Sequence, residues 1–391
     1  MPPPLTNPTS DRSLNLVLVT HEFHPHRGGI AIYAAEMARA ARSLGYEVEV
    51  WAPALPPGRP EPGWPFRVVR LPLAGDHSLR SQWRMIRHLS KQRDKLRGAT
   101  LYIPEPGPLL ALLLLQYFEA LEPAQLVLTF HGSEIQRLAS RRLLRWSTNH
   151  LLRKATRVSV VSHFARDLFQ RHFPDAAGKV VITSGTLRTD LAPVERNDPA
   201  PPRERIVVLT VARLNPRKGQ LQVIAALQAL PAAQRAQVEY WLVGAHSKEN
   251  YGTLLAAAAA AADFPVKFLG DVADEKLGEI YAAADIFAMT SMPHKHSVEG
   301  FGLVYLEAGA HLLPVVAHNI GGVSEAVAHE DSGLLVAPGD TPGLTRAFSR
   351  LLADPALRRR MGEAGRARAL RHTWREAALS LFGHPPGQQP A

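Results

Sequence analysis

Two hydrophobic patterns alternate along most of this chain. Short continuous apolar runs, such as LNLVLVT at 14–20, are typical of strands that are buried on both faces. Between them lie stretches with helical apolar spacing, such as IAIYAAEMARAARSLG at 30–45, which ends at a glycine. Strands that alternate with helices predict a parallel sheet between helical layers.

The alternation occurs in two series that a polar, proline-rich stretch separates. The first series predicts further strands within 46–53, 101–106, 125–133, 157–170 and 179–184, and the second within 205–215, 238–245, 266–272, 285–291 and 313–319. The stretch between them, LAPVERNDPAPPRE, has no period and is typical of a linker. Because 391 residues exceed what one core usually serves, we predict an α/β protein of two doubly wound, Rossmann-like domains that face each other across a cleft.

These patterns also set the domain bounds that we expect. A disordered tail at 1–13 precedes a first domain at 14–190, and the linker at 191–204 leads to a second domain at 205–365. The remainder, 366–391, is expected to form a C-terminal helix that packs back on the first domain, followed by a flexible tail.

Composition narrows the partners and the compartment. The chain has no cysteine, which favours a reducing compartment, the cytoplasm. Its apolar runs, such as Leu109 to Leu115, are far shorter than the roughly 18 to 20 residues that cross a bilayer. The formal charge of +10 indicates anionic partners, such as nucleotides, phosphorylated substrates, acidic lipids or nucleic acid.

Two predicted strand ends carry groups that suit a diphosphate. Gly28 and Gly29 follow the first strand and open its helix, where unpaired backbone N–H groups favour an anion and absent side chains let it come close. Arg213 and Lys218 lie just beyond the first strand of the second series, and two cations there can neutralise two phosphates. Plain loop glycines and solvated surface charge are the alternative interpretation. Ligands of such sheets bind at the carboxyl ends of the strands, so both pairs are expected at the cleft.

Glu299 and Glu307 stand eight positions apart around a Gly-Phe-Gly. In one continuous helix they would be separated by about 12 Å along the axis and about 80° around it. Glycosidase carboxylates stand roughly 5 to 9.5 Å apart, so a hydrolytic pair fits poorly. We expect Glu299 in a loop, accepting hydrogen bonds from substrate hydroxyls, and Glu307 two turns into the next helix, although a capping or surface role is the alternative for Glu307. Backbone donors at the helix start would come from Gly300, Phe301 and Gly302.

Six groups of motifs occur in a fixed order along the chain. They are RGGIAIYAAEMARA, TFHGSE, VARLNPRKG, FLGDV with YAAADIF, EGFGLVYLEAGA, and NIGGVSEAV with GLLVAPGD. In order and spacing they resemble the family-4 retaining glycosyltransferases (glycosyltransferase group 1), which have the GT-B fold. The resemblance runs from about Leu14 to the end of the last predicted helix, and the paired glutamates are its most specific mark. It implies a hexosyltransferase with a nucleotide-diphosphate sugar as donor and a sugar or lipid-linked acceptor.

The resemblance also implies roles for individual residues. Glu299 would hold hydroxyls of the donor sugar, Glu307 the ribose hydroxyls, and His131 would face the sugar. Val272 and Asp274 would lie near the base. The implied catalytic residues are His131, Arg213, Lys218 and Glu299, and the implied donor site consists of Gly28, Gly29, Arg213, Lys218, Val272, Glu299, Gly300, Phe301, Gly302 and Glu307.

The implied mechanism needs no nucleophile from the protein. A glycosyl–phosphate bond breaks through an oxocarbenium-like state, so the enzyme must stabilise the departing diphosphate and orient an acceptor hydroxyl on the same face. Once neutralised, the diphosphate can itself take the proton of the acceptor, which gives retention by front-side attack. The chain has no Asp-x-Asp motif, and His294 and His296 lack further ligands at metal-binding spacing. We therefore expect metal-independent chemistry, no cofactor, and closure of the domains around the donor.

Three positions depart from the pattern of the family. Residues 183–186 read TSGT where Pro-Asn-Gly-Val is usual, Ser324 replaces the proline before Glu325, and residues 245–247 read AHS in place of a glycine-rich turn. The resemblance therefore says less about which donor and acceptor this chain prefers than about its phosphate site.

Two stretches of the predicted first domain are basic and amphipathic. In residues 79–97, Leu79, Trp83, Ile86 and Leu89 have helical spacing among arginines and lysines, and residues 135–157 repeat the mixture. Such helices favour an anionic membrane surface, with a glycolipid, lipopolysaccharide or other cell-envelope precursor as acceptor and a peripheral position on the inner face of the membrane. The other interpretation is a solvated basic face whose apolar stripe packs on the domain core.

Two rival functions stay open on the sequence. A nucleic-acid-binding protein would fit the charge, but no recognition motif or aromatic-basic platform occurs, so nucleic acid is not an expected partner. A nucleotide-sugar epimerase of the same fold is the nearer rival, because a phosphorylase would be longer and would need a pyridoxal-binding lysine.

Overall fold

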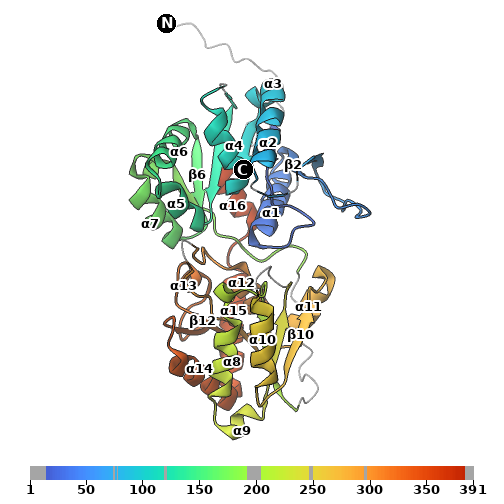
Figure 1. Ribbon diagram of the computed structural model, residues 1–391, viewed down its shortest axis with the longest axis vertical. Coiled ribbons are helices and arrows are strands. Elements are labelled where there is room, and N and C mark those ends of the chain that lie inside the picture. The colour runs from blue at the N-terminus through green and yellow to red at the C-terminus, as the bar shows by residue number, and fades with distance from the viewer. Residues whose placement is uncertain are drawn as a thin grey trace, which may run out of the picture.

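The computed structural model describes residues 15–73, 75–76, 78–118, 121–191, 204–245, 250–294 and 297–383. The predicted tail at 1–13, the linker residues 192–203, His246, Ser247 and His296 lie outside the described residues. The described chain forms two parallel α/β sheets, one above the other in Figure 1, and this confirms the prediction of two doubly wound sheets. We call each sheet with the helices that cover it the N-terminal lobe and the C-terminal lobe.

The N-terminal lobe has a seven-stranded sheet in the order β3-β2-β1-β4-β5-β6-β7, with every neighbouring pair parallel. Its strands are β1 (Asn15–Val19), β2 (Glu47–Pro53), β3 (Arg67–Leu71), β4 (Thr100–Ile103), β5 (Gln125–Phe130), β6 (Arg157–Val160) and β7 (Val180–Ile182). Its helices are α1 (Gly29–Ser43), α2 (Leu79–Lys91), α3 (Arg93–Arg97), α4 (Pro106–Leu115), α5 (Ser133–Ala139), α6 (Arg142–Lys154), α7 (His163–His172) and the 3-10 helix η1 (Pro174–Lys179). The sequence patterns missed β3 because this edge strand reads RVVRL, without a continuous apolar run.

The C-terminal lobe has a six-stranded parallel sheet in the order β10-β9-β8-β11-β12-β13. Its strands are β8 (Ile206–Val211), β9 (Val238–Val243), β10 (Val266–Gly270), β11 (Ile286–Met289), β12 (Val315–His318) and β13 (Gly333–Val336). Its helices are η2 (Pro216–Lys218), α8 (Gln220–Gln228), α9 (Ala232–Arg235), α10 (Tyr251–Ala260), α11 (Asp274–Ala282), α12 (Leu303–Ala310), α13 (Val323–Ala326), α14 (Thr341–Ala353) and α15 (Pro355–Ala369). In each sheet the strand order reverses beside the first strand, between β1 and β4 and between β8 and β11. Such folds form their ligand crevice at this point.

The carboxyl ends of the two sheets face each other, because loops that follow strands of one lobe touch loops that follow strands of the other. Arg27, after β1, donates from Nη1 to the carbonyl of Val272, after β10, at 2.6 Å. The amide of Val298, after β11, donates to Ser133 Oγ, after β5, at 3.0 Å. Glu325, after β12, accepts at 2.7 Å from the amide of His163, at the start of α7. The two crevices therefore open onto the same space between the lobes.

The last helix, α16 (Trp374–Phe382), returns from the C-terminal lobe to pack against α1 of the N-terminal lobe (Figure 1). Thr373 and Glu376 form a capping box at its start. At its end, the Tyr46 hydroxyl donates to the carbonyl of Phe382 at 2.9 Å. No helix within the described residues is both long and apolar enough to span a bilayer.

Candidate active site

The two glutamates of the Gly-Phe-Gly segment lie in different settings. Glu299 lies in the loop between β11 and α12, as predicted. Glu307 is the fifth residue of α12, so it lies one turn into that helix, and the prediction of two turns is wrong. The helix starts late because Gly302, its N-cap, has a left-handed φ of 94° that ends the loop only one residue before Leu303.

Lys218 and Glu299 form a largely buried ion pair. Lys218 ends the short helix η2, and Gly219 follows it with a φ of 76°. A Cβ on Gly219 would stand 1.9 Å from the carbonyl oxygen of Thr290, so only glycine lets this turn lie against the end of β11. That approach places Lys218 Nζ 2.8 Å from Glu299 Oε2, with side chains 15% and 11% exposed. Ser291 Oγ donates to the same oxygen at 3.0 Å.

The pKa values of both members of this pair are lowered, for different reasons. Burial lowers the pKa of Lys218, against the opposing effect of Glu299. Burial alone would raise the pKa of Glu299, but the nearby charges of Lys218 and Arg217 outweigh it, so the pKa of Glu299 is lowered. Glu299 is therefore held as a carboxylate inside the protein.

Arg213 and Arg217 place further positive charge beside Lys218. Arg213 is exposed just after β8, and its carbonyl accepts from Gln220 Nε2 at 3.0 Å. The charges of Arg217 and Arg213 both contribute to the lowered pKa of Lys218. Arg217 Nη1 also donates to the carbonyl of Val298 at 3.2 Å. Sequence reasoning missed Arg217, although it stands beside Lys218 in the PRKG segment.

His131 of the N-terminal lobe lies directly against the loop that carries Glu299. A Cβ on Gly300 would stand 1.9 Å from the carbonyl oxygen of His131, so the two backbones touch. The His131 ring is held by a 2.7 Å hydrogen bond between Nε2 and the carbonyl of Pro104 and by the edge of Tyr33, with ring centroids 5.2 Å apart. The structure thus brings together His131, Lys218, Glu299 and Gly300, while Phe301 is buried at 9% exposure beside them.

The Gly28–Gly29 turn lies at the edge of the same space. Gly28 is the N-cap of α1 and Gly29 its first residue, as expected for an anion-binding turn. A Cβ on either glycine would meet no protein atom within 4 Å, so the space beside them is open. The preceding residue, Arg27, reaches the other lobe, where Nη1 lies 2.9 Å from Asp271 Oδ1 in addition to its bond to Val272. The turn therefore stands opposite Val272, and Arg27 is a bridging residue that the sequence patterns missed.

Glu307 has different neighbours from Glu299. It is 2% exposed, and the Tyr281 hydroxyl donates to its Oε2 at 2.9 Å. Burial raises the pKa of Glu307, and the nearby charge of Arg188 only partly opposes this. Glu307 is thus a buried carboxyl group with one neutral hydrogen-bond donor.

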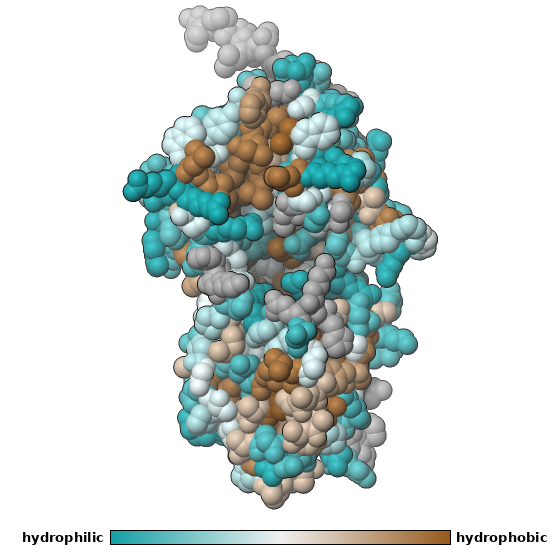
Figure 2. Space-filling model, viewed as in Figure 1, coloured by the Kyte–Doolittle hydropathy of each residue, from teal (hydrophilic) through white to brown (hydrophobic). Residues whose placement is uncertain are grey.

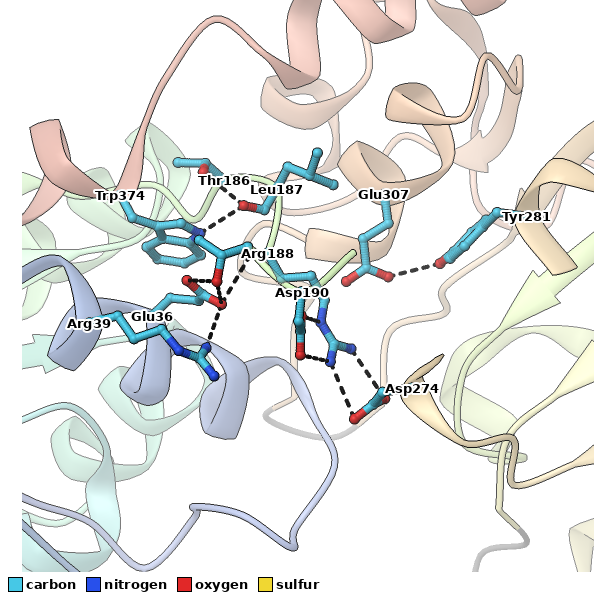
Figure 3. A network of polar contacts seen from close by, with 11 residues as sticks. Glu36, Arg39, Thr186, Leu187, Arg188, Asp190, Asp274, Tyr281, Glu307 and Trp374 are labelled. Atoms are coloured by element: carbon cyan, nitrogen blue, oxygen red, sulfur yellow. Dashed lines mark hydrogen bonds and ion pairs between the residues drawn. The ribbon is translucent and has the colours of Figure 1, made fainter. Parts of the chain in front are cut away.

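Arg188, which precedes the linker residues, joins two acidic groups, Asp190 and Asp274, near Glu307 (Figure 3). Its Nε and Nη2 donate to the two carboxylate oxygens of Asp190, at 2.5 and 2.7 Å. Nη2 also lies 3.3 Å from Oδ2 of Asp274, the first residue of α11. Asp274, which the resemblance places near the base, is therefore an ion-pair partner here. No local sequence pattern indicates Arg188, because its partner Asp274 lies 86 positions further along the chain.

Within the described residues, no group of three or more His, Cys, Asp or Glu side chains is arranged to hold a metal ion. His294 forms an isolated bridge with Ser297 in the loop before Glu299.

Two α/β lobes with facing strand ends, and a buried Lys–Glu pair at the crevice of the second, are the architecture of a two-lobed α/β enzyme. Residues 28–185 match the glycosyl transferase 4-like domain, and residues 192–368 match the glycosyl transferases group 1. The chain belongs to the group 1 glycosyltransferases and is a glycosyltransferase.

Individual relatives agree with this assignment. The chain is 31% identical to the GDP-mannose-dependent alpha-(1-6)-phosphatidylinositol monomannoside mannosyltransferase of Mycolicibacterium smegmatis, over 94% of this chain and 97% of that protein. It is 29% identical to the phosphatidyl-myo-inositol mannosyltransferase of the same organism, over 91% and 89% of the two chains. The structure of sucrose-phosphate synthase from Thermosynechococcus elongatus superposes with a TM-score of 0.78 at 24% identity, over 94% of this chain and 97% of that one. This likeness confirms the expected GT-B fold.

Proposed function

We propose that this glycosyltransferase moves mannose, with retention, from GDP-mannose to a hydroxyl group of a lipid-linked acceptor. The observation that carries the proposal is the Lys218–Glu299 pair, which sits at the crevice of the C-terminal lobe and against His131 of the other lobe. The choice of mannose and of a lipid acceptor rests on the relatives, which are named as GDP-mannose-dependent enzymes of phosphatidylinositol lipids.

The geometry of the pair suits a diphosphate beside a sugar. A lysine ammonium group has three donors, so the bond to Glu299 leaves two for phosphate oxygens. Both hydrogen bonds that described side chains make to the Glu299 carboxylate go to Oε2, which leaves Oε1 for sugar hydroxyls. Arg213, exposed beside Lys218, supplies a second cation for the leaving group.

The reaction then requires little more than positioning and charge stabilisation. Lys218, Arg213 and the N-terminus of α1 stabilise the negative charge that grows on the departing diphosphate. The acceptor hydroxyl approaches from the N-terminal lobe, near His131, and its proton passes to a phosphate oxygen on the same face of the sugar. Glu307 holds the ribose, and Val272 lies beside the base. In this proposal the chain needs no resident metal ion.

The test measures transfer directly. The full-length protein is incubated with GDP-mannose and phosphatidylinositol vesicles, GDP release is followed, and the anomeric configuration of the product is determined by NMR. We expect an α-linked mannolipid, formed equally well with and without EDTA. The Glu299→Gln variant should lose transfer, whereas the matched control Glu330→Gln, at an exposed ion pair with Arg350, should not. A new nucleotide-sugar epimer without release of GDP would overturn the proposal, and so would transfer with inversion.

A further inference from the structure

Tyr33 lies where the two lobes meet, and its ring contacts the ring of His131. It is the fifth residue of α1, about one helical turn after Gly29. The Tyr33 ring stands at 86° to the His131 ring, with centroids 5.2 Å apart, and at 76° to the ring of Trp374 in α16, with centroids 5.4 Å apart. Figure 2 shows hydrophobic side chains gathered on the surface of the N-terminal lobe, but Tyr33 and Trp374, at 2% and 5% exposure, are buried and belong to the interior.

The Tyr33 hydroxyl is tied to the residue that follows β7. It donates to the carbonyl of Thr183 at 3.1 Å and shares a second hydrogen bond with Thr183 Oγ1 at 2.6 Å. Thr183 is itself fixed, because its amide donates to the carbonyl of Val160 at 2.9 Å and its hydroxyl is bonded to Ser159 Oγ. A proline, which is usual at position 183 in the family, has neither a hydroxyl nor an amide hydrogen. The threonine therefore adds hydrogen bonds to this anchor that the usual residue cannot make.

Trp374 contacts both segments of chain that lead from one lobe to the other. It starts α16, directly after the return from α15 of the C-terminal lobe. Its Nε1 donates at 2.9 Å to the carbonyl of Leu187, in the segment that leaves the N-terminal lobe after β7 (Figure 3). In the same segment, a Cβ on Gly185 would stand 3.3 Å from Trp374 Cη2 and 2.2 Å from Cδ2 of Leu303, the first residue of α12. The ring of Tyr33 therefore touches the point where both segments meet the C-terminal lobe.

The contact with Tyr33 restricts the His131 ring in a way that its hydrogen bond does not. The carbonyl of Pro104 only accepts, so the 2.7 Å bond to it requires the hydrogen on Nε2 of His131. A single hydrogen bond leaves a ring able to turn about the line that joins the two bonded atoms. The Tyr33 ring, packed nearly at right angles to the imidazole, removes this freedom. His131 is thereby held in one tautomer and one orientation.

We propose that Tyr33 is a positioning residue for glycosyl transfer, which orients the His131 ring and ties that orientation to the seating of the two interlobe segments. The carbonyl oxygen of His131 lies against Gly300, so a shift of this residue changes the space between the lobes where donor and acceptor meet. A misplacement of about 1 Å near a reacting centre can cost on the order of 100-fold in rate. The inference rests on the proposed function in one respect, that His131 lies beside the reacting sugar.

The experiment measures kcat and KM for GDP-mannose with the full-length protein and phosphatidylinositol vesicles. Tyr33→Leu should lower kcat about 100-fold, because the His131 ring can then turn, and should leave KM unchanged. Tyr33→Phe keeps the ring and loses only the hydrogen bonds to Thr183, so kcat should fall about three- to tenfold. The matched control Tyr46→Leu removes a tyrosine that is 4% exposed and whose hydroxyl is bonded to the carbonyl of Phe382 at the end of α16, and it should leave kcat unchanged.

A double-mutant cycle separates positioning of His131 from a general loss of packing. In a His131→Ala background, Tyr33→Leu should cost nothing further in kcat, whereas independent effects would add. If Tyr33→Leu does not fold, Tyr33→Phe takes its place in the cycle, and its smaller loss should vanish in the same way. Additive losses overturn the proposal, and so does full activity of the His131→Ala variant, which leaves the proposed transfer itself intact.

Nitrogen NMR of isotope-labelled histidine rings gives a readout that does not depend on activity. The signal of His131, identified by its absence from the spectrum of His131→Ala, should show the hydrogen on Nε2 alone in the parent protein. Tyr33→Leu should give averaged shifts of the two tautomers, and Tyr46→Leu should not. Unchanged shifts in Tyr33→Leu would overturn the proposal. If the parent protein transfers no mannose, the proposed function fails, and these shifts alone decide whether Tyr33 orients His131.

Discussion

Glu299 and Glu307 have the same side chain and lie eight positions apart, and both are buried, yet their pKa values shift in opposite directions. The pKa of Glu299 is lowered because Lys218 and Arg217 outweigh its burial. The pKa of Glu307 is raised because burial dominates and its hydrogen-bond donor, Tyr281, is neutral. Neighbouring charges, rather than depth in the protein, decide whether a buried carboxyl group stays ionised. The difference suits two tasks, a fixed charge beside the reacting sugar and a hydrogen-bonding group for the nucleotide.

The strongest test of this comparison removes the positive charge of Lys218, which Glu299 has as a partner and Glu307 does not. Lys218→Met should lower kcat/KM about 10² to 10³-fold, because the leaving diphosphate loses a cation in the transition state. It should also lower the free energy of unfolding by about 3 kcal/mol, because Glu299 stays buried without its partner. Steady-state kinetics and urea unfolding measure the two effects.

Two variants control this prediction. Lys267→Met removes a lysine that is 54% exposed and paired with Glu239, and it should change the free energy of unfolding by less than about 1 kcal/mol. The double variant Lys218→Met/Glu299→Gln should regain most of the lost stability but none of the activity. If Lys218→Met alone keeps full activity, the phosphate assignment is wrong.

A smaller effect is expected at the second carboxyl group. Glu307→Gln should raise KM for the donor about tenfold, because a charged acceptor for the ribose hydroxyls becomes neutral. The value of kcat should change little, since the ribose lies away from the bond that breaks. The Tyr281 hydroxyl can still donate to the amide oxygen of glutamine, so the fold should hold. A fall in kcat without a change in KM would place Glu307 at the reacting sugar instead.

The contributions of the two glutamates to the free energy of unfolding should change with pH in opposite directions. Because the folded pKa of Glu299 is lowered, its contribution is present above the unfolded pKa of about 4.3 and is lost as the pH falls through the folded value. Because the folded pKa of Glu307 is raised, its ionisation destabilises the fold as the pH rises from about 4.3 through the folded value. Relative to the parent, Glu307→Gln should therefore gain stability as the pH rises, and Glu299→Gln should gain as it falls. Urea midpoints across this range measure both, and parallel curves for the two variants would contradict the assignment.

The sequence predicted the parts of the structure that local patterns determine. Buried runs such as Leu16 to Val19 marked most strands, and the turn around Lys218 was placed correctly at the end of β8. The patterns missed β3, and they included β13 only in the motif GLLVAPGD and not as a strand. Both strands are short and lack a long apolar run. The patterns also missed the partners that join the lobes, Arg27 with Val272 and Glu325 with His163, because these pairs lie 245 and 162 positions apart. Contacts over such separations depend on how the lobes meet, and no local spacing indicates them.

The smallest predicted effect concerns Arg188, the cation whose charge opposes the raised pKa of Glu307. Arg188 is 8% exposed and donates two parallel hydrogen bonds to the carboxylate of Asp190. The Arg188→Lys variant keeps the charge but loses this pair of hydrogen bonds. We expect a loss of about 1 kcal/mol in the free energy of unfolding, because hydrogen bonds to charged groups contribute about 1.5 to 3 kcal/mol and the lysine recovers part of this. The matched control Arg350→Lys, at an exposed forked pair with Glu330, should lose less than about 0.5 kcal/mol. Infrared spectroscopy of the carboxyl band measures the pH midpoint of Glu307 ionisation in the Arg188→Met variant. If this midpoint is unchanged, Arg188 does not act on Glu307. The contrast between the two glutamates then depends on Lys218 and Arg217 alone.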